Sequence, residues 1–386
     1  MIYRILIGLL CLFSLTTEGQ VLRDLNYNYL YDTNTPFTFQ WKITYDGSTY
    51  SIFYHITAND SSGLNDLNIQ LETRESLNDK SGNAFHNPPP FPKAGISSGT
   101  STLKSAPGQN LVVAKITIQR KEKKQTYYFS KQLPKNKLPY LKVDQHVVLS
   151  SFINTTNKGV TFSGFDANNP LQISYYKVSF PVAAPAFSNT QAKVSKTLKP
   201  DSVFSVVPTE FRKKGLYLVQ QDTTSADGVA FRVEEDYPKL NTIEGLAGPL
   251  IYICTKQEAE KLKQVGNDKK KFDQLILTIT GNSERARTFM RSYFRRIELA
   301  NQYFSSYKEG WKTDRGMIYT IFGLPEEVYL FDDREVWDYQ NNHVRIRFQF
   351  VRSPSLFDPD NYVLIRDKKF TTPWYEMIDL WRKARF

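Results

Sequence analysis

The chain has 386 residues, of which 40% are hydrophobic and 14% aromatic, and its formal net charge is +11. This length and apolar content predict two or three domains with cores of their own, and two cysteines exclude a disulfide framework. The basic residues are spread along the chain, so the charge does not predict a nucleic-acid partner, although an anionic lipid or glycan contact stays open.

The first 19 residues have the pattern of a secretory signal peptide. A basic residue, Arg4, precedes the apolar run Ile5 to Leu15, and small and polar residues follow up to Gly19. The apolar run is about half of the roughly 20 residues that span a bilayer. We therefore expect export and cleavage after Gly19, which would leave Gln20 as the amino terminus.

Cys11 raises the alternative of a lipoprotein, whose lipid-bearing cysteine follows a small residue. Here the preceding residue is Leu10, which is bulky, so we favour the signal peptide. Cys254 is then the only cysteine of the exported chain, and its apolar surroundings predict a buried, unreactive thiol.

Residues 20–138 have the period-two alternation of β-strands with one buried face. Phe37, Phe39 and Trp41 alternate with polar residues, and similar alternation recurs up to about residue 118. Asp46-Gly47 is a hairpin signal between two such runs. The pattern predicts a β-sandwich-like domain.

Residues 139–238 continue with shorter strand-like runs that are separated by turn formers, and Asp227-Gly228 is one example. This spacing indicates a second β-sandwich-like domain. A single larger sandwich over both regions is the alternative.

The pattern changes after Tyr237-Pro238, and residues 239–386 predict an α+β domain. Apolar residues recur at helical spacing in four segments, which are the one that starts at Thr255, residues 268–278, the one that follows a cap at Ser283, and residues 374–385. The patterns of 317–322, 336–339 and 344–351 instead indicate strands. The fold class expected for the whole chain is therefore multi-domain, with an all-β N-terminal part and an α+β C-terminal part.

The most distinctive segment is Gly310-Trp311-Lys312-Thr313-Asp314, followed by Arg315-Gly316-Met317-Ile318-Tyr319. It resembles the GWxTD-domain family of exported Bacteroidetes-type proteins, and the resemblance extends through Glu335-Val336-Trp337 to Trp374-Tyr375. The resemblance implies a setting in the cell envelope. It supplies no activity.

A structural interpretation of the motif makes Gly310 a helix C-cap with positive φ and Trp311 a core anchor. Asp314 would cap a helix or pair with Arg315 or with another arginine of the preceding helix. The functional interpretation is a partner-binding cluster, whose candidate residues are Trp311, Asp314, Arg315 and Trp337.

The segment from Gly316 through Gly323 and Pro325 to the strand containing Phe348 also resembles small lipoproteins that assist outer-membrane β-barrel assembly. Those proteins share a helix, a Gly-x-Pro turn and a short antiparallel meander. This weaker resemblance implies partner binding and assembly.

Motifs of catalysis are not found in the sequence. The four histidines are scattered, and neither a Gly-rich phosphate loop nor a Gly-x-Ser-x-Gly occurs. The acidic stretches 332–335 and 358–360 are typical of solvated turns, with a calcium ion as the alternative. We predict no catalytic residue, no metal and no cofactor.

These patterns lead to a hypothesis of a non-catalytic, periplasm-facing accessory or scaffold protein of an outer-membrane protein assembly or secretion complex. Its partners would be envelope proteins, including an outer-membrane β-barrel complex. The helical basic end Trp381 to Phe386 is unlike a sorting domain, so we expect the periplasm or the periplasmic face of the outer membrane. An envelope glycan-binding or glycan-processing protein is the alternative.

Overall fold

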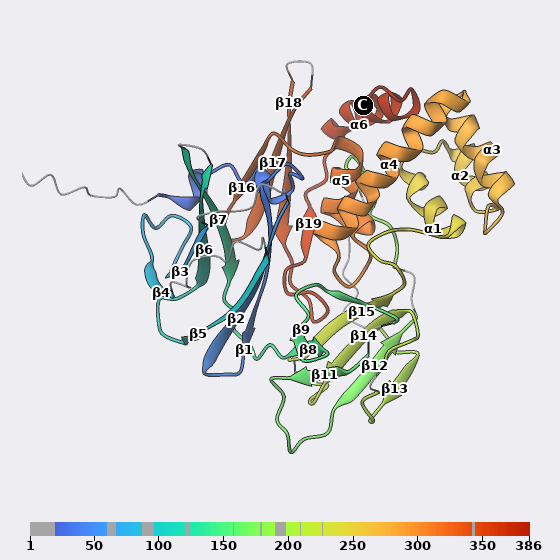
Figure 1. The fold of residues 1–386 in the computed structure, drawn as a ribbon. Coiled ribbons are helices and arrows are strands. Elements are labelled where there is room, and N and C mark those ends of the chain that lie inside the picture. The colour runs from blue at the N-terminus through green and yellow to red at the C-terminus, as the bar shows by residue number, and fades with distance from the viewer. Residues whose placement is uncertain are drawn as a thin grey trace, which may run out of the picture.

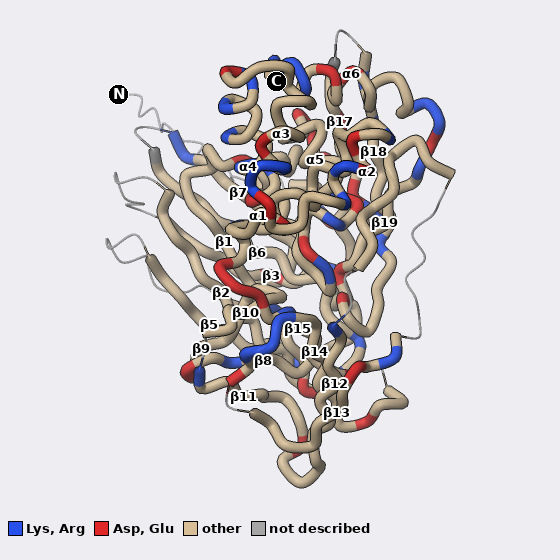
Figure 2. Tube along the Cα trace, turned by 90° about the vertical axis from the view of Figure 1, so that its right-hand side faces the viewer, with Lys and Arg blue, Asp and Glu red and all other residues tan. Residues whose placement is uncertain are grey.

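The computed structural model describes residues 20–386, apart from 60–66, 87–95, 121–122, 157, 178–179, 190–197, 209, 226 and 342–343. The expected signal peptide and Cys11 lie outside the described residues. Sheets form the N-terminal part, then helices follow, and a last sheet packs with helices at the C-terminus (Figure 1). The predicted order of an all-β part and an α+β part is confirmed. Figure 2 shows the same fold turned by 90°, with Lys and Arg residues on the β units as well as on the helices.

Two antiparallel sheets form the first β unit. One contains β1 (Phe37–Tyr45), β2 (Thr49–Ala58) and β5 (Ile96–Lys104), and the other contains, in spatial order, β4 (Asn83–His86), β3 (Asn68–Arg74), β6 (Leu111–Arg120) and β7 (Lys123–Gln132). Apolar side chains from both sheets share one core, because alternate residues point to the same face. The Asp46-Gly47 hairpin joins β1 to β2, as predicted, with Gly47 at φ +108°.

Two further sheets form the second β unit. The larger has the spatial order β10 (Phe152–Asn154), β15 (Val229–Glu234), β14 (Gly215–Gln220), β12 (Gln172–Tyr176) and β13 (Ser202–Phe204), and the smaller contains β11 (Val160–Ser163), β8 (Tyr140–Val143) and β9 (His146–Val147). Leu141 and Val160 of the smaller sheet pack with Tyr217 and Phe231 of the larger one in a separate core.

The helices of the C-terminal part are α1 (Ile243–Ala247), α2 (Lys256–Leu262), α3 (Lys269–Thr280), α4 (Ser283–Phe304), α5 (Asp314–Phe322) and α6 (Thr371–Arg382), with 3-10 turns η3 (Gly248–Tyr252), η4 (Gly310–Lys312) and η5 (Lys368–Phe370). The predicted apolar stripe of α4 is confirmed, since Phe289, Tyr293 and Ile297 are buried. Asn282, rather than Ser283, caps this helix by accepting the Arg285 N–H. Among the described residues, no helix is both long enough and apolar enough to cross a membrane.

Residues 317–322 were predicted as a strand, and this prediction is wrong because they belong to α5. Nearly every residue of α5 is buried, so the helix lacks the polar face that reveals helical periodicity. The last sheet has the order β16 (Glu327–Leu330), β17 (Arg334–Asn341), β18 (Val344–Arg352) and β19 (Tyr362–Leu364). The predicted pairing of 336–339 with 344–351 is confirmed in β17 and β18.

An N-terminal segment with two short turns, η1 (Leu22–Asp24) and η2 (Asn28–Leu30), ties the first β unit to the C-terminal sheet. The Tyr27 N–H donates to the Val328 carbonyl at 2.8 Å, and the Val328 N–H donates to the Asn26 side chain at 3.0 Å. In the opposite direction, the Tyr29 hydroxyl donates to the Tyr128 carbonyl of β7 at 2.6 Å and accepts the Tyr128 N–H at 2.9 Å. This segment therefore contacts both β7, about 100 residues later in the chain, and β16, about 300 residues later.

Replacing Tyr29 with phenylalanine tests this connection. Tyr29→Phe keeps the ring but leaves both main-chain groups of Tyr128 without their partner, so we expect the free energy of unfolding to fall by about 1–3 kcal/mol. Urea denaturation measures this loss. The control is Tyr375→Phe, whose side chain is exposed, and an equal effect of the two substitutions would contradict the assignment.

Candidate functional site

The GWxTD motif occupies the turn between α4 and α5. A Cβ atom on Gly310 would lie 2.1 Å from the Ala300 carbonyl oxygen and 2.6 Å from the Asn301 Cα, so only glycine permits this approach to α4. The expectation of a C-cap with positive φ is wrong, because Gly310 begins the turn η4 and the last residue of α4 is Phe304. Close packing of two main chains is the physical reason for this glycine.

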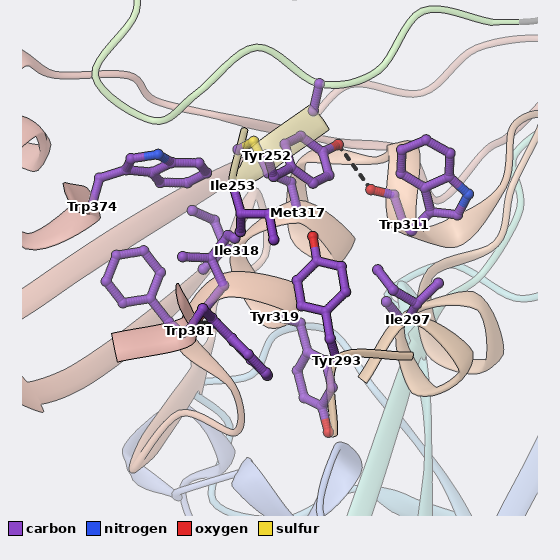
Figure 3. Packing of buried hydrophobic residues seen from close by; sticks show 14 of the residues in the cluster. Tyr252, Ile253, Tyr293, Ile297, Trp311, Met317, Ile318, Tyr319, Trp374 and Trp381 are labelled. Carbon is purple, nitrogen blue, oxygen red and sulfur yellow. Dashed lines mark hydrogen bonds between the residues drawn. The ribbon is translucent and has the colours of Figure 1, made fainter. Parts of the chain in front are cut away.

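Trp311 is buried in the C-terminal core, as its structural interpretation predicts. Its N–H donates to the Asn301 side-chain oxygen at 3.1 Å, and its carbonyl accepts the Tyr252 hydroxyl at 2.9 Å. Figure 3 shows this second bond and the surrounding cluster, which includes Tyr293 and Met317. The residue thus joins η3 to the end of α4.

Thr313 caps α5, with its hydroxyl oxygen accepting the Gly316 N–H at 3.0 Å. Asp314 follows in the first turn and is buried, and its carboxylate pairs with Arg366 at 2.5 Å. It also accepts the Leu364 N–H at 2.8 Å. The predicted pairing with Arg315 or an arginine of the preceding helix is wrong, since the partner lies 52 residues later in the chain.

Arg315 instead pairs with Glu335 of β17 at 2.9 Å, and its guanidinium lies 4.2 Å from the centre of the Tyr362 ring. The Glu335 carboxylate also accepts the Tyr31 hydroxyl at 2.5 Å and the Trp337 indole N–H at 2.7 Å. A buried carboxylate is stable only with such partners. Glu335 therefore brings Arg315 and Trp337 together and holds the N-terminal segment through Tyr31.

The four candidate residues from the sequence occupy three separate places. Arg315 and Trp337 share Glu335, whereas Trp311 lies against Tyr252 and Asp314 lies against Arg366. Trp311, Asp314 and Trp337 are 5%, 4% and 0% exposed, but the Arg315 side chain is 19% exposed. These contacts assign packing roles to the three buried residues, and partner binding by the four residues stays a prediction.

The segment just before the motif contacts the second β unit. Arg232 of β15 donates to the Tyr307 carbonyl at 3.0 Å and lies 3.4 Å from the Glu309 carboxylate. The Gly310 N–H donates to the Tyr237 hydroxyl at 3.1 Å. Strand β15 is therefore bonded to the segment just before the motif, and Tyr237, which follows β15, is bonded to the first residue of the motif.

A cleft of about 1050 Å³ lies between the three parts of the chain, and the sequence patterns did not predict it. Strand β1 contributes one wall, and residues 149–152 and 228–230 of the second β unit contribute another. The C-terminal part contributes residues of α4 and the loop before β19. Its lining includes Arg315 and Glu335, and among its other members are Thr38, Gln40, Lys42, Ser130, Lys131, Arg295, Tyr303, Phe357, Asp358 and Tyr362.

Asp358 and Lys42 of this cleft have pKa values shifted towards neutral pH. Burial raises the pKa of Asp358 to about 6, with the nearby Asp360 adding to the effect. Burial and the neighbouring Lys131 lower the pKa of Lys42 to about 8. Among the described residues, no group of three or more His, Cys, Asp or Glu side chains is placed to hold a metal ion.

Cys254 lies outside this cleft and packs against the C-terminal core. It is only partly buried, but burial of its thiol raises the pKa to about 12. Because the thiolate is the reactive form, a raised pKa favours the unreactive thiol at neutral pH, whereas the predicted full burial of Cys254 is met only in part.

Residues 215–383 match the family model of the GWxTD domain, so the chain contains such a domain. The match begins at β14, inside the second β unit, and the contacts of Arg232 with Tyr307 and Glu309 give a physical reason for including these strands. No curated protein and no solved structure matches the chain.

Removing the charge of Asp314 tests the buried pair. Asp314→Asn leaves Arg366 buried beside a neutral side chain, and we expect a loss of about 3–5 kcal/mol in the free energy of unfolding. Asp379→Asn is the control, because its pair with Lys383 is exposed and contributes less than about 1 kcal/mol. Urea denaturation compares the two variants, and similar losses would contradict a special role for Asp314.

The raised pKa of Asp358 predicts that the stability of the folded chain depends on pH. The carboxyl pKa is above its ordinary value in the folded chain, so bound protons favour folding, and this stabilisation is lost as the pH rises through about 6. Asp358→Asn removes the charge, and we expect a higher thermal unfolding midpoint at pH 7.5 with little change at pH 4.5. A midpoint that falls at pH 7.5 would show that the carboxylate stabilises the fold.

Proposed function

We propose that this chain is a non-catalytic scaffold or accessory protein that faces the periplasm and serves an outer-membrane protein assembly or secretion complex. Support for the envelope setting comes from the signal-peptide pattern of residues 1–19 and from the resemblance of the motif to exported Bacteroidetes-type proteins. The GWxTD domain itself supports neither a reaction nor a location.

The observation that carries the proposal is the cleft, which lies where several parts of the chain meet. The first β unit, the second β unit, the N-terminal segment and the GWxTD domain all supply residues to it. Binding sites occur preferentially where domains meet. A partner bound there would contact all of these parts at once, as expected for a scaffold.

The carboxylates of Asp314 in the motif and of Glu335 in β17 support binding rather than chemistry. Asp314 is engaged by Arg366 and by the Leu364 N–H, and Glu335 is engaged by three donors. A general acid or base has to exchange its proton with a substrate. These carboxylates instead hold α5, β17 and β19 in fixed positions.

A second surface with the character of a protein contact lies on and after β13, an edge strand of the second β unit. Val203, Phe204 and Val206 are 51%, 41% and 81% exposed. Apolar side chains grouped at a sheet edge favour association with another polypeptide. They provide a further contact for a partner held in the cleft or for another subunit.

Site-directed photo-crosslinking in cells that express the protein natively tests this proposal. A photoreactive amino acid replaces Gln40, which is exposed and lines the cleft. The matched control replaces Lys270, which is exposed on α3. We expect specific adducts with envelope proteins, an outer-membrane β-barrel protein among them, from position 40 and not from position 270.

Two outcomes would contradict the proposal. Adducts containing only glycan would favour the alternative of an envelope glycan-binding protein. Equal adduct patterns from positions 40 and 270, or a protein found only in the cytoplasm after fractionation, would remove the basis for a periplasmic scaffold with its site in the cleft.

A further inference from the structure

Strand β1 has one edge without a partner strand. It pairs with β2 along all nine residues, and it is the outer strand of the three-stranded sheet β1-β2-β5. Among the described residues, no strand pairs with the opposite edge, where an isolated bridge joins only Tyr45 to Leu138. Figure 1 shows β1 on the side of the first β unit that faces the rest of the molecule.

The bridge at Tyr45 identifies which main-chain groups point to this edge. The Tyr45 N–H donates to the Leu138 carbonyl at 3.4 Å, and the Leu138 N–H donates to the Tyr45 carbonyl at 2.8 Å. In an antiparallel strand, alternate residues direct both groups to the same side. The outward groups of β1 therefore belong to Ile43, Trp41, Phe39 and Phe37, and the last three of these residues line the cleft.

The side chain of Lys131 confirms this alternation and places charge at the edge. Its ammonium group donates to the Trp41 carbonyl at 3.0 Å. Lys42 lies nearby, donates to the Val148 carbonyl at 2.7 Å and has its pKa lowered in part by Lys131. A carboxylate between these two cations would relieve their repulsion.

A side chain already substitutes for a strand partner at a second edge strand, β7, whose residues Phe129 to Gln132 also line the cleft. Strand β7 is also an edge strand, and the Tyr29 hydroxyl bonds both main-chain groups of Tyr128 there. The N-terminal segment thus covers part of β7. At Phe37 and Phe39 the edge of β1 borders the cleft instead.

We propose that the cleft binds an extended polypeptide segment of another protein, which adds to the free edge of β1 and places an acidic side chain beside Lys42 and Lys131. The bound strand spans about 14 Å from Phe37 to Trp41, or about five residues. Its main chain supplies affinity, and alternate side chains supply specificity. This inference names how the partner of the proposed scaffold is held, and it rests on that proposed function.

The test uses the full exported chain and a displayed library of random ten-residue peptides with one central glutamate. Phe39→Pro removes the outward N–H, and proline is tolerated at an edge strand whose N–H points away from the sheet. Phe39→Ala is the matched control, since it loses the same ring but keeps the N–H. We expect the selected peptides to bind Phe39→Pro about tenfold more weakly than Phe39→Ala.

A measurement on the peptide keeps the test valid if Phe39→Pro does not fold. Selected peptides are N-methylated at every second residue, in the two possible registers, and are titrated against the unaltered protein. One register should lose at least about tenfold in affinity and the other should retain it, because only one set of N–H groups faces β1. Replacing the glutamate with glutamine, or Lys131 with methionine, should also weaken binding.

Failure of this inference differs from failure of the proposed function. If no peptide is enriched, if the two N-methyl registers are equivalent, or if envelope glycan fragments alone bind the cleft, strand addition to β1 is wrong. If crosslinked envelope proteins are nevertheless captured from position 40, the scaffold proposal stands without it. If those adducts are also missing, both proposals fall.

Discussion

The arrangement of the C-terminal part depends on two buried carboxylates and the groups that neutralise them. Transfer of a carboxylate from water into a protein interior costs several kcal/mol unless charges and hydrogen bonds compensate. Asp314 meets this requirement through Arg366, which also donates to the Ala184 carbonyl at 3.0 Å, and Glu335 meets it through Arg315, Trp337 and Tyr31. Each carboxylate therefore fixes segments that are distant in sequence. Asp314 of the motif, the adjacent Arg315 and Glu335 of β17 are satisfied only when α5, β17, β19 and the N-terminal segment are all in place, so together they determine the positions of these elements.

Sequence patterns predicted the elements whose faces differ in polarity. The residues of the first β unit's strands alternate between a buried and an accessible face, and α4 has one apolar stripe. The sequence therefore shows apolar residues at the spacing of a strand or of a helix in these elements. Helix α5 was missed because it is buried on all sides. The partner of Asp314 was missed because nothing local distinguishes Arg366 from the other arginines, and the choice is made by the fold. The cleft was missed for the same reason, since it is formed by segments from three parts of the chain.

The motif also changes how the chain is divided. Pattern changes near Tyr237-Pro238 favour a boundary there, yet the family match begins at β14. The hydrogen bonds from Arg232 to Tyr307 and from Gly310 to Tyr237 explain why strands on one side of this point accompany helices on the other. The second β unit nevertheless has a core of its own. The separate core of the second β unit favours a boundary near Tyr237-Pro238, whereas the hydrogen bonds across this point favour a boundary before β14.

The N-terminal segment can form its contacts with the C-terminal sheet only late in the folding of the chain. Asn26 and Tyr27 bond to residues about 300 positions later in the chain. A polypeptide emerges from the ribosome, or from an export channel, with its amino terminus first. The first β unit can then form early from local hairpins, but its leading segment has no docking surface until β16 has arrived. Contacts of such high sequence separation are slow to form, so Asn26 and Tyr27 can complete their contacts only after residues that are synthesised much later.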